Sequence, residues 1–122
     1  AADRALEDVD AVDEDGNAFL DDYGVQMVTR GLKYNAIQTV KQQQSGYLSR
    51  TDWYIIRKAD VGTAIPTAIQ TFRNAIRADA TRIENAITAA TTMDEFIALH
   101  TTTYNEDRTV DQIAITQSWT EE

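Results

Sequence analysis

The side chains of this protein that could do chemistry are its carboxylates, which are densest near the N-terminal end. Residues 1–22 hold nine acidic side chains against Arg4 alone, a net charge of −8. Paired acids can serve as general acid and base in glycoside hydrolysis, but no aromatic pocket accompanies these. A solvated acidic surface explains them without any reaction. We therefore predict no catalytic residues and no enzyme.

The sequence DEDGN, residues 13–17, has some likeness to a calcium-binding loop. With Gly16 placed at the sixth loop position, the first ligand position falls on Ala11, which has no ligand oxygen. The twelfth position falls on Asp22 instead of the usual glutamate. We therefore expect no metal at this turn.

The chain lacks the other groups that common active sites need. It has no cysteine and a single histidine, His100, which removes most zinc sites and the usual pairs of nucleophile and base. No glycine-rich phosphate loop is present. We expect no cofactor, and a small enzyme acting through the acidic N-terminal segment is disfavoured for the same reasons.

The charge changes sign twice along the sequence. Residues 30–82 hold nine bases against three acids, a net charge of +6, and residues 83–122 hold eight acids against Arg108 alone, a net charge of −7. Either the acidic ends fold back beside the basic centre of their own subunit, or they meet the basic centre of a neighbouring one. The overall charge of −9 repels phosphate, so we expect no nucleic acid partner. No apolar run approaches the roughly 18 residues of a membrane span.

Residues 1–31 are predicted to be an acidic arm or a short β-hairpin with a connector. Asp15 and Gly16 form a strong turn pair between apolar residues, which favours the hairpin. The density of acids favours a flexible arm instead. The weak alternation of residues 23–31 suits a short strand or an extended connector.

Residues 32–100 are predicted to be helical. Apolar spacing predicts a helix over 32–45 that continues through Tyr47 and Leu48. Thr51 is suited to cap the next helix with its hydroxyl, and Gly62 is suited to end it in a left-handed conformation.

The clearest period in the chain predicts an amphipathic helix from Pro66 to about residue 89. Its apolar stripe consists of Ile69, Phe72, Ile76, Ile83 and Ile87. Asp79 lies near this stripe and is predicted to mark a bend or to pair with Arg82 or a neighbour. Thr92 and Glu95 have the spacing of a capping box, which opens a short further helix.

Residues 101–122 are predicted to be an extended C-terminal segment. Ile113 and Ile115 share a face if this segment is a strand. Trp119 is either a buried anchor against its own domain or a contact to a partner, since tryptophan is favoured at interface centres.

Together these patterns predict a mostly α fold, with a helical hairpin or three-helix core between extended N- and C-terminal arms. The core is predicted to gather around Trp53 where two short helices meet, with Trp53 buried. Its predicted members are Trp53, Ile56, Ile69, Phe72 and Ile76.

The central segment resembles a module common in tailed-phage tail proteins, in particular the C-terminal part of tail-fibre assembly proteins. The matching residues are Leu48, Thr51-Asp52-Trp53, Ile55-Ile56-Arg57, Gly62, Ile65-Pro66, Phe72-Arg73 and Ile76-Arg77. Phe72 stands where the module usually has tyrosine, and Ile76 where it usually has leucine. The resemblance covers about 30 of the 122 residues.

This resemblance implies a virion structural protein of a bacteriophage tail, neck or baseplate, present in several copies and bound to other tail proteins. The alternative that it implies is a tail-fibre assembly chaperone that is not retained in the particle. Arg73 and Arg77 lie four residues apart on one helical face and are expected to bind acids of the arms, in the same subunit or the next. Trp53, Phe72, Arg73, Arg77, Ile113 and Trp119 are the predicted structural or interface residues.

Overall fold

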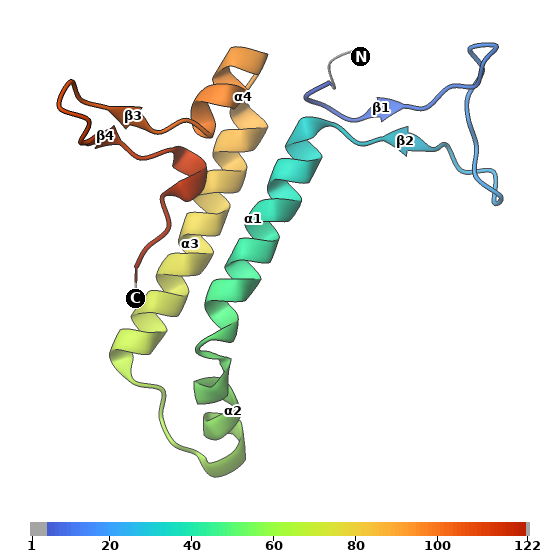
Figure 1. The fold of residues 1–122 in the computed structure, drawn as a ribbon. Coiled ribbons are helices and arrows are strands. Elements are labelled where there is room, and N and C mark those ends of the chain that lie inside the picture. Colours follow the sequence, from blue (N-terminus) through green and yellow to red (C-terminus); the bar gives the residue numbers. More distant parts are fainter. Residues whose placement is uncertain (1–4, 122) are drawn as a thin grey trace. The chain divides into compact units, whose positions relative to one another are not determined.

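The computed structural model describes residues 5–121. The chain divides within its first helix into two compact units, an N-terminal unit that ends at Gln38 and a helical unit that begins at Thr39. Helices form most of the regular structure, so the prediction of a mostly α fold with terminal arms is confirmed (Figure 1).

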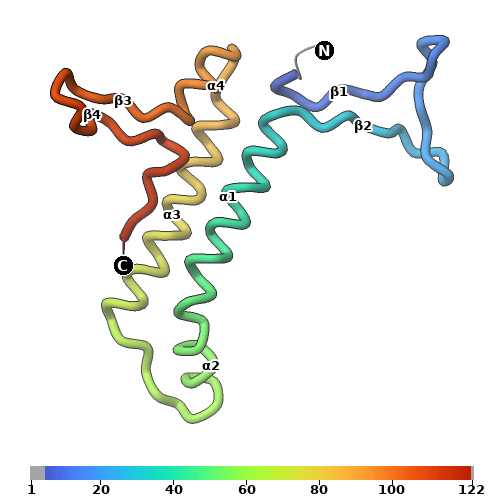
Figure 2. Tube along the Cα trace, viewed as in Figure 1, coloured from blue at the N-terminus to red at the C-terminus, as the bar shows by residue number. Residues whose placement is uncertain are grey.

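The helical unit is built on two long helices that lie side by side (Figure 1, Figure 2). Helix α1 spans Leu32–Ser49 and enters the unit at Thr39, and α3 spans Thr67–Ala89. Lys41 on α1 pairs with Glu84 on α3 at 3.3 Å, which ties the two helices together on their surface. The predicted helices 32–48 and 66–89 are therefore confirmed.

A continuous apolar seam runs along α3 and forms the core of this unit. Its residues recur every three or four positions, as a helix with one buried face requires. The buried apolar members on α3 are Phe72, Ile76, Ala80, Ile83 and Ile87, and the other buried apolar residues of the unit are Val40, Ala90 and Ala114. Removing this apolar surface from water, at about 25 cal/mol per Å², is the main stabilising term of the unit.

Helix α2, Asp52–Val61, connects the long helices and ends as the sequence predicts. Gly62 adopts φ 76° and its N–H donates to Lys58 O at 2.9 Å, which is the expected left-handed stop. Thr51 holds the predicted cap position before α2, but the predicted capping bond from its hydroxyl is wrong. Its hydroxyl donates backwards to Leu48 O at 3.2 Å and makes no capping bond, because the side chain is buried beside Arg73.

The prediction that Trp53 and Ile56 belong to the core is also wrong for this chain. Trp53 is 50% exposed and Ile56 67% exposed, and α2 buries none of its residues. Ile69 is only half-buried. The core lies along α3 instead. The buried residue next to α2 is Thr51, which anchors the helix through polar contacts.

Helix α4, Met93–Leu99, follows α3 and begins at the predicted capping box. The Thr92 hydroxyl accepts from Glu95 N at 3.2 Å, as expected. The Glu95 carboxylate accepts from the N–H of Thr91 at 2.7 Å, one residue earlier than the box requires.

The C-terminal segment folds onto its own helical unit. Strands β3, Thr103–Tyr104, and β4, Val110–Gln112, pair antiparallel, and the 3-10 helix η1, Ile115–Gln117, follows them. The sequence suggested a strand near β4 but gave no sign of β3. Ile115 lies in η1, so the predicted extended face shared by Ile113 and Ile115 does not form.

The N-terminal unit is a small β structure that leads into α1. Strands β1, Val9–Asp10, and β2, Val28–Thr29, pair antiparallel, and isolated bridges join Val12 to Ala18 and Leu20 to Gln26. Figure 1 shows two tight loops at the end of this ladder that is remote from α1. Of the two interpretations that the sequence left open, the hairpin is the one that forms, and it forms more than once.

Residues at the start of the described chain cap the first turn of α1. The N–H groups of Leu32 and Lys33 donate to the carbonyls of Ala5 and Leu6, and Asp8 accepts from the N–H of Gly31 at 2.8 Å. A side chain at Gly31 would collide with the Leu6 and Glu7 carbonyls, so this close approach needs glycine. These bonds satisfy N–H groups that a helix start leaves without partners.

Candidate protein-interaction surfaces

Three short ladders of the N-terminal unit meet at a closed ring of backbone hydrogen bonds. Ala11 N–H donates to Met27 O at 2.9 Å, Met27 N–H donates to Phe19 O at 2.8 Å, and Phe19 N–H donates to Ala11 O at 3.0 Å. Each of the three residues is both donor and acceptor. The ring therefore fixes the junction of the ladders without any buried side chain.

The side-chain amide of Gln26 lies over this ring. Its nitrogen is 2.8 Å from Ala11 O, 3.2 Å from Phe19 O and 2.6 Å from Met27 O. Three carbonyl oxygens that converge repel one another, and an amide nitrogen brings two N–H donors to compensate them. Gln26 is thus the polar centre of the unit.

The two loops of the N-terminal unit are copies of one turn. In each, an aspartate carboxylate, that of Asp13 or Asp21, accepts two backbone N–H groups at 2.8–2.9 Å. In each, the glycine three residues later has positive φ, 82° at Gly16 and 78° at Gly24. The second loop was not predicted, although its signal, the repeat of Asp-x-x-Gly after eight residues, is visible in the sequence.

The acidic residues of these turns do not gather into a metal site. The carboxylate oxygens that accept at Asp13 and Asp21 already bond to backbone N–H groups of their own loops. Within residues 5–121, no group of three or more acidic or histidine side chains is placed to hold a metal ion.

None of the residues from 9 to 30 is buried, although many are apolar. Tyr23 is 92% exposed at a loop tip. The other exposed apolar residues of the unit are Val9, Val12, Phe19, Leu20, Val25, Met27 and Val28. Because successive strand residues point to opposite faces, such a single layer shows apolar side chains to water on both sides.

Helix α2 carries a second exposed surface, which is partly aromatic. The rings of Trp53 and Tyr54 stack with centroids 3.8 Å apart, and the Arg57 guanidinium lies 5.0 Å from the Trp53 centroid. Ile56 is one helical turn from Trp53 and shares its face. This surface combines apolar area with positive charge.

The buried side chain of Arg73 on α3 fixes the start of α2. Its Nη1 lies 2.9 Å from Leu48 O, 2.8 Å from Thr51 Oγ1 and 3.0 Å from Asp52 Oδ1. All three contacts come from this one nitrogen, so the guanidinium gathers oxygens from the end of α1, from Thr51 and from α2 at a single point. The threonine and aspartate of the Thr51-Asp52-Trp53 motif thus fix the helix, and the tryptophan faces outwards.

Among the described residues, the contacts of Arg73 and Arg77 within this chain involve no acid of an arm, and contact with an arm of a neighbouring copy stays a prediction. Arg73 pairs with Asp52, which belongs to α2. Arg77 is exposed and its polar contact is Asn74 Oδ1 at 3.4 Å. Phe72, next to Arg73, is buried in the seam.

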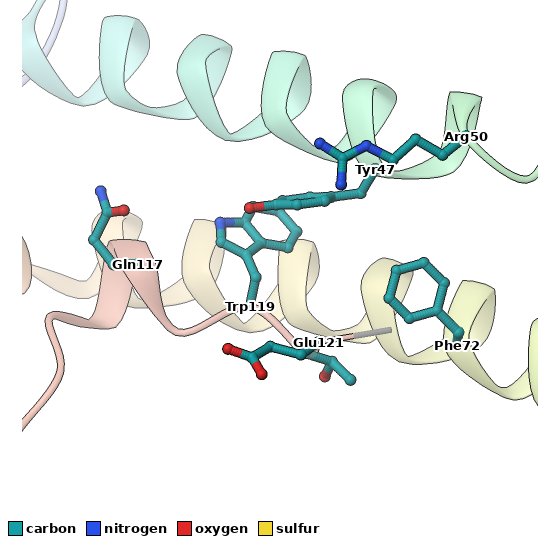
Figure 3. A pocket seen from close by; sticks show the side chains of 7 residues that line it. Tyr47, Arg50, Phe72, Gln117, Trp119 and Glu121 are labelled. Carbon is teal, nitrogen blue, oxygen red and sulfur yellow. The ribbon is translucent and has the colours of Figure 1, made fainter.

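The C-terminal segment anchors to its own helices through Trp119. The Trp119 ring lies 5.2 Å from that of Tyr47 on α1. Both line a hollow of about 320 Å³ together with Arg50 and Phe72 (Figure 3). Of the two interpretations of Trp119, the structure therefore shows the anchor. Ile113 remains 55% exposed.

Polar contacts to α3 reinforce this anchor. Arg82 donates to Ser118 O at 2.8 Å, and Asp79 accepts from Thr120 N at 2.7 Å and pairs with Arg82 at 3.3 Å. Partial burial raises the pKa of Asp79, but hydrogen bonds from Thr120 and Arg82 outweigh it and leave that pKa below its ordinary value. The predicted pair between Asp79 and Arg82 is confirmed.

Comparisons with family models, with curated proteins and with solved structures give no match to this chain. Over residues 5–121, none of the helices is both long and apolar enough to cross a membrane.

Proposed function

We propose that this protein is a structural subunit of a bacteriophage tail, neck or baseplate, present in several copies and acting through protein–protein contacts without catalysis. The resemblance of residues 48–77 to phage tail modules supports the phage part of this proposal. The observation that carries the assembly part is the N-terminal unit, in which the apolar residues from 9 to 30 are left uncovered.

Monomeric proteins rarely expose so many neighbouring apolar side chains, and exposed patches of this kind mark interaction sites. An isolated two-stranded ladder is marginal in water, and short strands need a covering layer for independent stability. A partner that covers Phe19, Leu20 or Met27 would supply the apolar burial that the unit lacks.

The α2 surface supports the same role. Arg73 fixes the helix from inside the protein, so Trp53 and Ile56 are presented on a rigid element. Interfaces gain most from aromatic and arginine side chains on such pre-organised elements, since little further ordering is then needed on binding.

Mass spectrometry of purified particles tests the proposal. We expect peptides of this chain in particles that have been washed at high salt, at several copies per particle. A chain that is abundant in infected cells but missing from washed particles would contradict the proposal and favour the assembly chaperone.

A further inference from the structure

We infer that the N-terminal unit of one copy docks on the α2 surface of another copy. This inference deepens the proposed assembly role, on which it rests, but it does not depend on the phage assignment. We define the docking surface of the helical unit, the tip surface, as Arg50, Trp53, Ile56, Arg57 and Lys58.

The N-terminal unit is strongly negative. Between residues 5 and 31 the chain carries eight acids and only Arg30 as a base. Asp8 pairs with Arg30, and Glu7 pairs with Lys33 of α1. Among the described residues, no ion pair neutralises the other six, which are Asp10, Asp13, Glu14, Asp15, Asp21 and Asp22.

This charge argues against two N-terminal units covering each other. Five of the six acids lie in the two loops, namely Asp13, Glu14, Asp15, Asp21 and Asp22. Like charges brought together at an interface cost free energy and suppress wrong pairings. A partner for this unit must therefore bring positive charge as well as apolar area.

The tip surface has both properties. Asp52 is neutralised by Arg73, which leaves Asp60 as the remaining acid between residues 50 and 61. Arg50 and Arg57 lie over aromatic rings, at 5.6 Å from Tyr47 and 5.0 Å from Trp53, and neither they nor Lys58 form an ion pair with a described acid.

The two surfaces also match in their apolar content. The N-terminal unit offers Phe19 and Met27 from its central ring, and the tip surface offers Trp53 and Ile56. Every copy carries one surface of each kind. A second copy is therefore the partner whose chemistry is already complementary, and charge complementarity of this kind gives both specificity and fast association.

Sedimentation velocity of the full chain tests the contact between copies. We expect the mass of the wild-type protein to rise with concentration above that of a monomer. Phe19→Ser and Trp53→Ser should each weaken self-association by roughly tenfold or more, since each removes an aromatic centre of one surface. Ile97→Ser and Val110→Ser are matched controls, because both residues are 55% exposed outside the two surfaces. Both controls should assemble like the wild type.

Mixing the two defective variants gives the decisive result. The Phe19→Ser copy keeps an intact tip surface and the Trp53→Ser copy keeps an intact N-terminal unit, so an equimolar mixture should form a one-to-one dimer. That rescue also shows that both variants fold. A wild-type protein that stays monomeric at all concentrations, because its N-terminal unit covers its own helices or needs another protein, would overturn the inference. A mixture that fails to pair would overturn it too.

Charge variants provide an independent check that leaves the apolar residues untouched. Asp15→Lys and Lys58→Glu should each weaken association at low salt, and a mixture of the two should pair at least as well as the wild type. If pairing fails but the chain is found in particles, the structural role stands and this contact is wrong. If pairing occurs but the chain is missing from particles, the contact stands and the virion role fails.

Discussion

The interactions that stabilise the helical unit differ from those that stabilise the N-terminal unit. In the helical unit, α3 buries an unbroken aliphatic stripe, and Ile76, Ile83 and Ile87 are fully enclosed. In the N-terminal unit, the residues from 9 to 30 include none that is buried, and backbone bonds, two aspartate turns and one glutamine define the structure.

The difference has a thermodynamic consequence. The net contribution of a hydrogen bond to folding stability is only about 1 kcal/mol, because the unfolded chain forms hydrogen bonds to water instead. Ordering the backbone of each residue costs about 1–2 kcal/mol in conformational entropy. Burial of apolar surface normally offsets that entropy. The helical unit has this term, and the residues from 9 to 30 do not, so we expect only the N-terminal unit to depend on a partner for its stability.

The largest expected effect comes from the core of the helical unit. Ile83→Ala should lower the free energy of unfolding by about 2–5 kcal/mol, because the side chain is 0% exposed and its removal leaves a cavity. Urea unfolding followed by helical circular dichroism measures this loss. Ile97→Ala, at an exposed position on α4, should cost less than about 1 kcal/mol. Equal losses at the two positions would mean that the seam is not the core.

Arg73 is expected to have the next largest effect. Arg73→Lys should cost about 1–3 kcal/mol, because the lysine side chain is shorter and cannot place its nitrogen where Nη1 contacts Leu48 O, Thr51 Oγ1 and Asp52 Oδ1. Arg77→Lys, four residues along α3 and exposed, should cost less than about 0.5 kcal/mol. Thermal unfolding of the two variants side by side measures the difference, and a null result at Arg73 would remove its role as the anchor of α2.

Gln26 is where the N-terminal unit should be most sensitive. Gln26→Leu should lower the stability of the three-ladder junction by about 1–2 kcal/mol, because three carbonyl oxygens lose their shared donor. Faster amide exchange at Phe19 and Met27, measured at the high protein concentrations where we expect this unit to be covered, would report the loss, with the helical unit unchanged. Gln42→Leu, on the exposed side of α1, is the matched control and should leave exchange at both amides unaltered.

The smallest effect concerns a type of turn that occurs in both units. Arg108, in the loop between β3 and β4, has φ 70° where the N-terminal loops have Gly16 and Gly24. Arg108→Gly should stabilise the β3–β4 hairpin by about 0.4–1 kcal/mol, since it relieves the left-handed conformation of a residue with a side chain. Slower amide exchange at Gln112 would measure the gain.

The reverse change supplies the control for that turn. Gly16→Ala should weaken the first N-terminal loop by about 1 kcal/mol, and through backbone conformation alone, because no atom lies within 4 Å of the added carbon. If Arg108→Gly proves destabilising, the guanidinium makes a contact that outweighs the conformational gain.

Predictions from the sequence were right where a strong apolar period or a turn residue defined the element. The isoleucine spacing predicted α3, and Gly62 predicted the end of α2, because both act through local geometry. The burial of Arg73 and Thr51 could not be predicted, since it depends on how α1, α2 and α3 meet. Trp53 was expected inside, where two short helices meet, but a short helix fixed by polar contacts leaves its aromatic face exposed.

In the N-terminal unit, the sequence indicated a turn near Gly16 but not the junction of ladders. Its strands are two residues long, too short for alternation to be read. The repeat of Asp-x-x-Gly after eight residues was the available signal. The ring formed by Ala11, Phe19 and Met27 depends on backbone bonds, which any residue type except proline can make.

Hydrogen–deuterium exchange of the full chain over a range of protein concentrations tests the central claim most directly. We predict that amides of α1 and α3 within the helical unit are protected at every concentration, because their stability comes from their own core. Amides of residues 9–29 should exchange freely in dilute protein and become protected as concentration rises and partners cover them. Strong protection of residues 9–29 that is already complete in dilute, monomeric protein would contradict the account.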